Sequence, residues 1–363
     1  MPSIWNKKEE IGGLSKNAHF GWDIVLSKNA DLIAISSPLS DDDNNGLTDS
    51  GQVKVYNLSD KKNIVQIGNS LNGSVSQQKF GHSIDISDDG KILAVGSPGD
   101  GNGSVGVYEL KNNSWNLIGE DIDGVSNNDS FGWSVNLSND GKLLAIGDPK
   151  YDLANGTTDV GSVKVFAFEE EQNKWLEVGN TFFGTDANQN LGYSIDLDNN
   201  LLAIGSPEIN IDDKKGFVSI YQLDGTQWSQ IGNDILGEKN TDESGSSLVL
   251  VSPNSELAKS TVAIGAMKND GEGKLNSGHV RVYEYDQINN IWLKKGNDID
   301  GSLVGDLSSY SLDISANADY LGIGSIEHNY LNNENSGQLR IFNFDQNSNI
   351  WRQSGFDIGG NRI

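Results

Sequence analysis

Cysteine is absent from this chain of 363 residues, and proline, histidine and arginine are scarce. Without cysteine the protein has no disulfide bonds and no cysteine-ligated metal centre. The absence of cysteine does not indicate whether the protein works in an oxidising or a reducing compartment. Only 6 prolines stand against 43 glycines, so turns are expected to rest on glycine, and no proline-rich linker separates domains. The 4 histidines occur at no spacing that makes a metal site.

Long apolar runs are missing as well. No stretch of about 18 apolar residues occurs, so no membrane span is expected. The first residues also lack the apolar centre of a secretory signal, which indicates either that the chain is not exported by that route or that a leader has been left out.

Positive charge is scarce, and the formal net charge is −25. Such a surface repels phosphate backbones, so no nucleic acid partner is expected. The same charge suits solubility in general and the binding of hard cations such as calcium.

A phrase of roughly 50 to 60 residues recurs six times and predicts the architecture. Its clearest copies begin at Phe80-Gly81-His82-Ser83 and Phe131-Gly132-Trp133-Ser134. A glycine stands seven residues before each copy. Counting seven residues forward from Gly237 and Gly301 identifies two less well preserved copies, which begin at Ser244 and Ser308. The marking glycines are Gly13, Gly73, Gly124, Gly184, Gly237, Gly301 and Gly360.

A repeat of this length with several short strands predicts an all-β propeller rather than a solenoid. We expect one propeller domain over 1–363 with four strands in each of six blades. The predicted blades are 14–73, 74–124, 125–184, 185–237, 238–301 and 302–360, and 1–13 is predicted as an extra outer strand.

The second blade shows the strand pattern most clearly. Residues 81–86 alternate apolar and polar side chains, and 91–95 form a short apolar run typical of a buried strand. Residues 104–110 alternate again, and 115–119 complete the blade. One place in the outermost strand carries a tryptophan in five blades, which indicates packing between blades. These tryptophans are Trp115, Trp175, Trp228, Trp292 and Trp351.

The number of outermost strands is uneven, because Ile4 and Trp5 precede the first copy. Six blades are favoured, with this extra tryptophan strand at the seam. Seven blades, one of them incomplete, are the alternative.

The phrase F-G-x-S followed by A-V-G-S-P resembles the FG-GAP repeats of integrin α-subunit propellers. Phe80-Gly81 and Gly96-Ser97-Pro98 carry the resemblance, and Gly51-Gln52-Val53-Lys54-Val55-Tyr56 matches the strand that follows. It covers nearly the whole chain and implies a propeller that binds proteins or glycans outside the cell. FG-GAP repeats also carry a calcium loop between their first two strands, but the turn here is short, so those sites do not carry over by position.

A calcium-like string occurs elsewhere, with oxygen-bearing residues at alternate positions around a glycine. The predicted ligands are Asp41, Asp43, Asn45, Leu47 and Asp49. Weaker echoes are 155–159 and 270–276. The alternative for each is an acidic, solvated loop of turn-forming residues.

Two further features indicate where ligands would bind. The loops between second and third strands vary widely in length, and variable loops on a rigid scaffold commonly carry specificity. The third position of each copy is mostly aromatic, which suits stacking on a sugar ring or a protein side chain; packing between blades is the alternative. These residues are Trp22, His82, Trp133, Tyr193 and Tyr310.

Three function classes stay open. A non-catalytic binding or adhesion module for a protein or glycan is favoured, and a self-associating surface or virion component is the second. The third is a polysaccharide-acting enzyme, which we rank lowest, since a sialidase needs three converging arginines and the four arginines all lie in the last quarter of the chain. We expect an extracellular, cell-surface or virion-associated location.

Overall fold

The structure is a computed structural model that describes residues 10–13, 17–60, 63–99, 101–126, 129–252, 259–329 and 335–360. These residues form two compact units. The described residues up to Gly192 form the first unit, and those from Tyr193 onward form the second. The predicted extra strand at Ile4 and Trp5 lies outside the described residues.

The first unit carries three sheets, each made of consecutive strands. The first sheet contains β1 (Ile24–Leu26), β2 (Leu32–Ser37), β3 (Gln52–Asn57), β4 (Val65–Gln66) and β5 (Leu71–Asn72). The second contains β6 (Ser83–Ile86), β7 (Ile92–Ser97), β8 (Ser104–Lys111), β9 (Ser114–Leu117) and β10 (Ile122–Asp123). The third contains β11 (Ser134–Leu137), β12 (Leu143–Asp148), β13 (Ser162–Glu169), β14 (Lys174–Glu177) and β15 (Phe182–Phe183).

The second unit carries three more sheets. The fourth sheet contains β16 (Ile195–Asp198), β17 (Leu201–Ser206), β18 (Phe217–Asp224), β19 (Gln227–Gln230) and β20 (Ile235–Leu236). The fifth contains β21 (Ser244–Val251), β22 (Thr261–Ala266), the short 3-10 helix η1 (Gly271–Gly273), β23 (His279–Asp286), β24 (Ile291–Lys294) and β25 (Ile299–Asp300). The sixth contains β26 (Ser308–Ile314), β27 (Tyr320–Ser325), β28 (Gln338–Asp345), β29 (Ile350–Gln353) and β30 (Ile358–Gly359).

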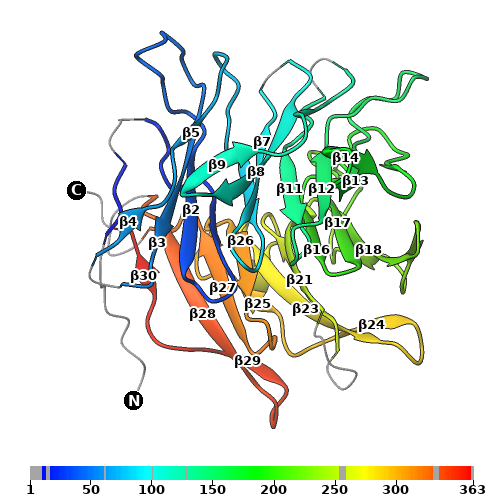
Figure 1. Ribbon diagram of the computed structural model, residues 1–363. Coiled ribbons are helices and arrows are strands. Elements are labelled where there is room, and N and C mark those ends of the chain that lie inside the picture. The colour runs from blue at the N-terminus through cyan, green and yellow to red at the C-terminus, as the bar shows by residue number, and fades with distance from the viewer. Residues whose placement is uncertain are drawn as a thin grey trace. The chain divides into compact units, whose positions relative to one another are not determined.

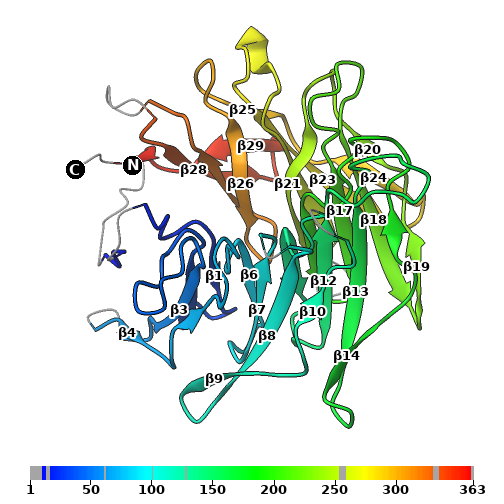
Figure 2. The same ribbon diagram turned by 90° about the horizontal axis from the view of Figure 1, so that it is seen from above.

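Every sheet has the same antiparallel order, with the first four strands side by side in chain order (Figures 1 and 2). This confirms the prediction of six four-stranded blades, and each sheet lies within one predicted blade range. A fifth strand of two residues, not predicted, pairs with the third strand beside the fourth. The marking glycine follows it directly, so the repeat boundary is where the chain leaves one blade for the next.

The second strand of each blade forms the centre of the core. Leu144 and Ile146 of β12, and Leu202 and Ile204 of β17, are 0% exposed. Burying a side chain of this size contributes about 1.5–3 kcal/mol. A strand covered on both faces needs apolar residues throughout, which explains the continuous apolar run of the sequence.

Neighbouring blades are joined by the predicted tryptophans. The indole of Trp292 in the fifth blade donates to the carbonyl of Ile231 in the fourth at 3.1 Å, and its Cδ1 atom would lie 2.6 Å from a Cβ placed on Gly232. Trp115 repeats this contact on Ile67 and Gly68. Here the tryptophans pack between blades, as predicted.

Candidate functional site

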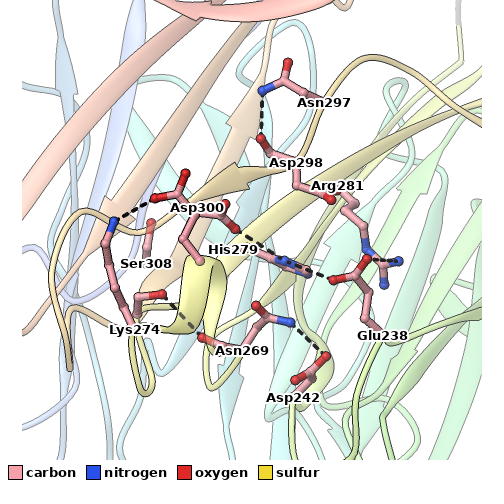
Figure 3. A network of polar contacts seen from close by, with 12 residues as sticks. Glu238, Asp242, Asn269, Lys274, His279, Arg281, Asn297, Asp298, Asp300 and Ser308 are labelled. Atoms are coloured by element: carbon pink, nitrogen blue, oxygen red, sulfur yellow. Dashed lines mark hydrogen bonds and ion pairs between the residues drawn. The ribbon is translucent and has the colours of Figure 1, made fainter.

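Polar and charged side chains of the fourth and fifth blades gather around His279, the first residue of β23 (Figure 3). The residue is 1% exposed. Its Nδ1 atom lies 3.8 Å from Oδ1 of Asp300 and 3.9 Å from Oε2 of Glu238. Both separations are longer than a hydrogen bond. The imidazole therefore lies between two carboxylates and is close to both.

Strand pairing brings these residues together. His279 and Asp300 are direct partners in the register of β23 and β25. Glu238 follows β20 of the preceding blade by two residues. Arg281 joins the two blades, because its Nη2 atom donates to the carbonyl of Leu236 at 2.9 Å while Nη1 lies 3.8 Å from Oε1 of Glu238.

The η1 turn packs against Asp300. A Cβ atom on Gly271 would lie 2.6 Å from Oδ1 of Asp300, so a glycine allows the backbone to approach the carboxylate. Just before this turn, the side-chain amide of Asn269 donates to Oδ2 of Asp242 at 2.9 Å, and both residues are buried. This buried hydrogen bond anchors the start of the turn.

Burial raises the pKa of Asp300, and the charges of Asp298 and Glu272 raise it further. The ammonium group of Lys274 acts in the opposite direction. Burial lowers the pKa of His279 to about 4, with Arg281 as the next cause, so the imidazole is neutral at pH 7. A carboxylate whose pKa is raised is a stronger base than an ordinary aspartate and suits proton removal from water.

Three of the predicted aromatic residues meet in the first unit. The Trp22 indole donates to the carbonyl of His82 at 3.0 Å, and Nδ1 of His82 lies 3.0 Å from the carbonyl of Trp133. The rings of Trp22 and His82 are 5.7 Å apart, and those of His82 and Trp133 are 4.4 Å apart. Burial lowers the pKa of His82 to about 4. The rings thus pack from blade to blade, which is the alternative given for them, and ligand binding by them stays a prediction.

The two predicted tyrosines belong to the second unit. Tyr310 is 43% exposed. Burial raises the pKa of Tyr193 to about 12, and Tyr310 is the next cause, so their hydroxyls lie within electrostatic reach of each other.

The predicted calcium loop is closed by its own hydrogen bonds. Oδ1 of Asp41 accepts from the Asp49 amide at 2.8 Å, and the carbonyl of Leu47 accepts from the Asp42 amide at 2.8 Å. The Asn45 side chain donates to Asp42 at 2.8 Å. Asp43 is exposed. Calcium at this loop stays a prediction. To bind calcium, the loop would have to break several of these hydrogen bonds and form metal contacts in their place.

Within the described ranges, no group of three or more His, Cys, Asp or Glu side chains is arranged to hold a metal ion. In the same part of the chain, no helix is long and apolar enough to cross a membrane.

Comparison with solved structures finds propellers of the same fold. The chain is similar to a provisionally named 6-phosphogluconolactonase of Bacteroides uniformis, with 11% identity and a TM-score of 0.61 over 94% of this chain and 86% of that chain. It is similar to the periplasmic gluconolactonase of Pseudomonas aeruginosa, with 13% identity and a TM-score of 0.61 over 97% and 89%. A provisionally named 6-phosphogluconolactonase of Bacteroides fragilis matches at 13% identity and a TM-score of 0.58 over 93% and 84%. The fold is a six-bladed β-propeller.

No family model and no curated protein matches the chain. The resemblance to FG-GAP repeats and the extracellular, cell-surface or virion-associated location therefore stay predictions. At identities this low, the structural likeness establishes the fold alone.

The expectation of a non-catalytic binding or adhesion module, and with it the expectation that the chain is no enzyme, is contradicted by these neighbours. Three of them carry the names of lactonases. The scarcity of arginine excluded a sialidase site, which grips a substrate carboxylate with three arginines. A lactone has no carboxylate before its ring is opened, so the lack of arginines does not exclude hydrolysis of a lactone.

Proposed function

We propose that this protein hydrolyses a sugar lactone, the internal ester of an aldonic acid, at the site around Asp300. The observation that carries the proposal is the placement of Asp300, a partly exposed carboxylate of raised pKa, beside the buried neutral imidazole of His279. The similarity to solved lactonases of the same fold supports the choice of reaction.

Asp300 would act as the general base. As a water molecule attacks the lactone carbonyl carbon, the Asp300 carboxylate takes one proton from it, and negative charge develops on the carbonyl oxygen. The bond between that carbon and the ring oxygen then breaks, and the leaving oxygen receives the proton that Asp300 took from the water, which restores the carboxylate. The product is the open-chain hydroxy acid. General base catalysis of this kind contributes typically about 10²- to 10⁴-fold in rate.

Other residues of the site have separate roles. Lys274, whose charge already acts on Asp300, would stabilise the negative carbonyl oxygen. Glu238, which is 40% exposed, would accept hydrogen bonds from sugar hydroxyls. His279 and Arg281 are buried and would act as positioning residues, because His279 lies between the two carboxylates and Nη1 of Arg281 lies 3.8 Å from Oε1 of Glu238.

Charge favours an unphosphorylated substrate. Among the charges that act on Asp300, the acids Asp298, Glu272 and Glu238 outnumber the cation Lys274, and the chain as a whole carries −25. A phosphorylated lactone would be repelled by this field, whereas a neutral lactone would not.

Hydrolysis of glucono-δ-lactone by the purified protein tests the proposal. Acid release is followed in weak buffer, the spontaneous rate is subtracted, and the 6-phosphorylated lactone is compared at equal concentration. We expect a protein-dependent rate that is at least tenfold higher for the neutral lactone. A faster rate with the phosphorylated lactone would overturn the charge argument, and no rate above background with either lactone would overturn the proposed function.

A further inference from the structure

A second acidic cluster lies in the first unit, around Asp129 and Asp148. Asp148 is the last residue of β12 and is 2% exposed, while Asp129 precedes the third copy of the repeat and is 3% exposed. Oδ1 of Asp148 and Oδ2 of Asp129 are both buried without a hydrogen-bond partner. A buried carboxylate oxygen with no donor is costly, so some cation or proton is expected to compensate it.

The repeats show that these two acids are additions to the fold. Where the third blade has Asp148, the first two have the neutral Ser37 and Ser97. Where it has Asp129, the second blade has Gln78, whose Oε1 atom accepts from the backbone amide of Ser74 at 2.7 Å. A serine and a glutamine therefore satisfy the fold at these positions, and the third blade has replaced both with carboxylates.

Two other blades also carry an acid at the Asp129 position, and each supplies a donor for it. Asp242 accepts from the side-chain amide of Asn269 at 2.9 Å. Asp306 lies 3.0 Å from Nδ1 of His328. In both cases the donor comes three residues after the second strand of the blade.

In the third blade that donor position is occupied by Tyr151. Its ring packs against Phe183, with the two ring centres 5.2 Å apart. The hydroxyl of Ser126 is bonded to the carboxyl of Asp129, but Oδ2 stays without a donor. The acid is thus present while the side chain that satisfies it in the fifth and sixth blades is not.

The surrounding charges increase the need for a cation. Asp152 acts on both carboxyl groups, and Asp159 acts on Asp129. Lys164 is the cation that acts on Asp148, and it is outweighed, because burial and then Asp129 raise the pKa of Asp148 to about 8. The segment that carries Asp152 and Asp159 includes one of the calcium-like echoes of the sequence.

We propose that Asp129 and Asp148 together bind a hard divalent cation, for which calcium is the best fit. The donor set consists of carboxylate oxygens, which calcium prefers, and the unmatched negative charge supplies the attraction. Because no third acidic side chain converges there within the described residues, backbone carbonyls and water complete the coordination shell. This site is independent of the proposed lactone hydrolysis.

Two variants that restore the residues of the other blades test the site while leaving the fold intact. They are Asp148→Ser and Asp129→Gln. The midpoint temperature of unfolding is measured with calcium chloride and with EDTA at matched ionic strength. We expect calcium to raise the midpoint of the wild-type protein by a few degrees and to leave both variants unchanged. Asp43→Ala serves as the control, since it alters the 41–49 loop, and it should keep the full calcium effect.

Three results would overturn the proposal. The first is a wild-type protein that calcium does not stabilise, and the second is a calcium effect that survives in both variants. The third is a calcium effect lost in Asp43→Ala alone, which would assign the cation to the 41–49 loop. A wild-type protein that is stabilised by lower pH but not by calcium would assign a proton to the pair in place of the cation.

Discussion

Oδ2 of Asp85 accepts a hydrogen bond of 2.6 Å from the backbone amide of Leu137, which belongs to the next blade. Asp23 makes a similar contact, with its Oδ2 atom accepting from the Ile84 amide at 2.8 Å. Both link the innermost strands of neighbouring blades in the first unit. A carboxylate in this place ties two sheets together but is partly removed from water in doing so.

Burial gives the folded protein a pH dependence of definite sign. It raises the pKa of Asp85 to about 7 and that of Asp23 to about 6. Between about pH 4 and pH 7 the folded state therefore binds more protons than the unfolded state, and the free energy of unfolding falls as pH rises. One pKa unit corresponds to about 1.4 kcal/mol, so the total loss is on the order of a few kcal/mol.

Asp85→Asn should weaken this dependence. The third blade already has an asparagine, Asn136, at the equivalent position, so the side chain fits the strand. We expect the variant to lose less stability than the wild type between about pH 5 and pH 8 in urea unfolding. Identical slopes for the two proteins would show that Asp85 is not the group that titrates.

Ser309 has the backbone conformation of a glycine. The equivalent position in the preceding blade is Gly245, with φ of 89°, whereas Ser309 has φ of 82°. Its hydroxyl is also buried without a hydrogen-bond partner. Ser309→Gly should stabilise the protein by about 1 kcal/mol, because relief of strain and of the unsatisfied hydroxyl outweighs the entropy cost of glycine.

Chemical denaturation measures this gain, and the reverse change, Gly245→Ser, is its matched control. The control should destabilise, since a Cβ atom there would lie 2.7 Å from the carbonyl oxygen of Phe217. A destabilised Ser309→Gly protein would contradict the assignment of strain.

The contribution of the contact between Trp292 and Gly232 to stability can be tested by substituting two glycines. Gly232 and Gly225 have φ of 68° and 64°, so alanine strains the backbone equally at both. A Cβ atom on Gly232 would lie 2.6 Å from Trp292, while one on Gly225 would meet nothing within 4 Å. We expect Gly232→Ala to cost about 1–3 kcal/mol more than Gly225→Ala in thermal or urea unfolding. Equal losses of stability in the two variants would mean that the close contact between Gly232 and Trp292 does not contribute to stability.

Much of the fold could be predicted from the sequence, because each strand has a residue pattern of its own. The apolar run at 91–95 led to β7, and the alternation at 104–110 led to β8. The short fifth strand could not be predicted in the same way. Two residues such as Ile122 and Asp123 are too few to show a period.

The candidate site was hidden from the sequence for a different reason. The string D-I-D-G occurs twice, at 121–124 and at 298–301, and the two copies are identical. The strand register pairs Asp300 with His279, but it pairs Asp123 with Ser104. Only the partner strand distinguishes them, and that partner lies about twenty residues away in the chain. Carboxylates are so abundant here that no pair stood out before the strands were placed.

The same duplication supplies the most direct test of the proposed function. Asp300→Asn and Asp123→Asn make the same substitution in the same short sequence, at the end of equivalent strands. The measurement is kcat/KM for glucono-δ-lactone with the spontaneous rate subtracted, alongside the unfolding midpoint of each protein. We predict that Asp300→Asn lowers kcat/KM by about 10²-fold or more without a matching loss of stability, and that Asp123→Asn leaves it unchanged. Equal activity of the two variants would contradict the placement of the reaction at Asp300.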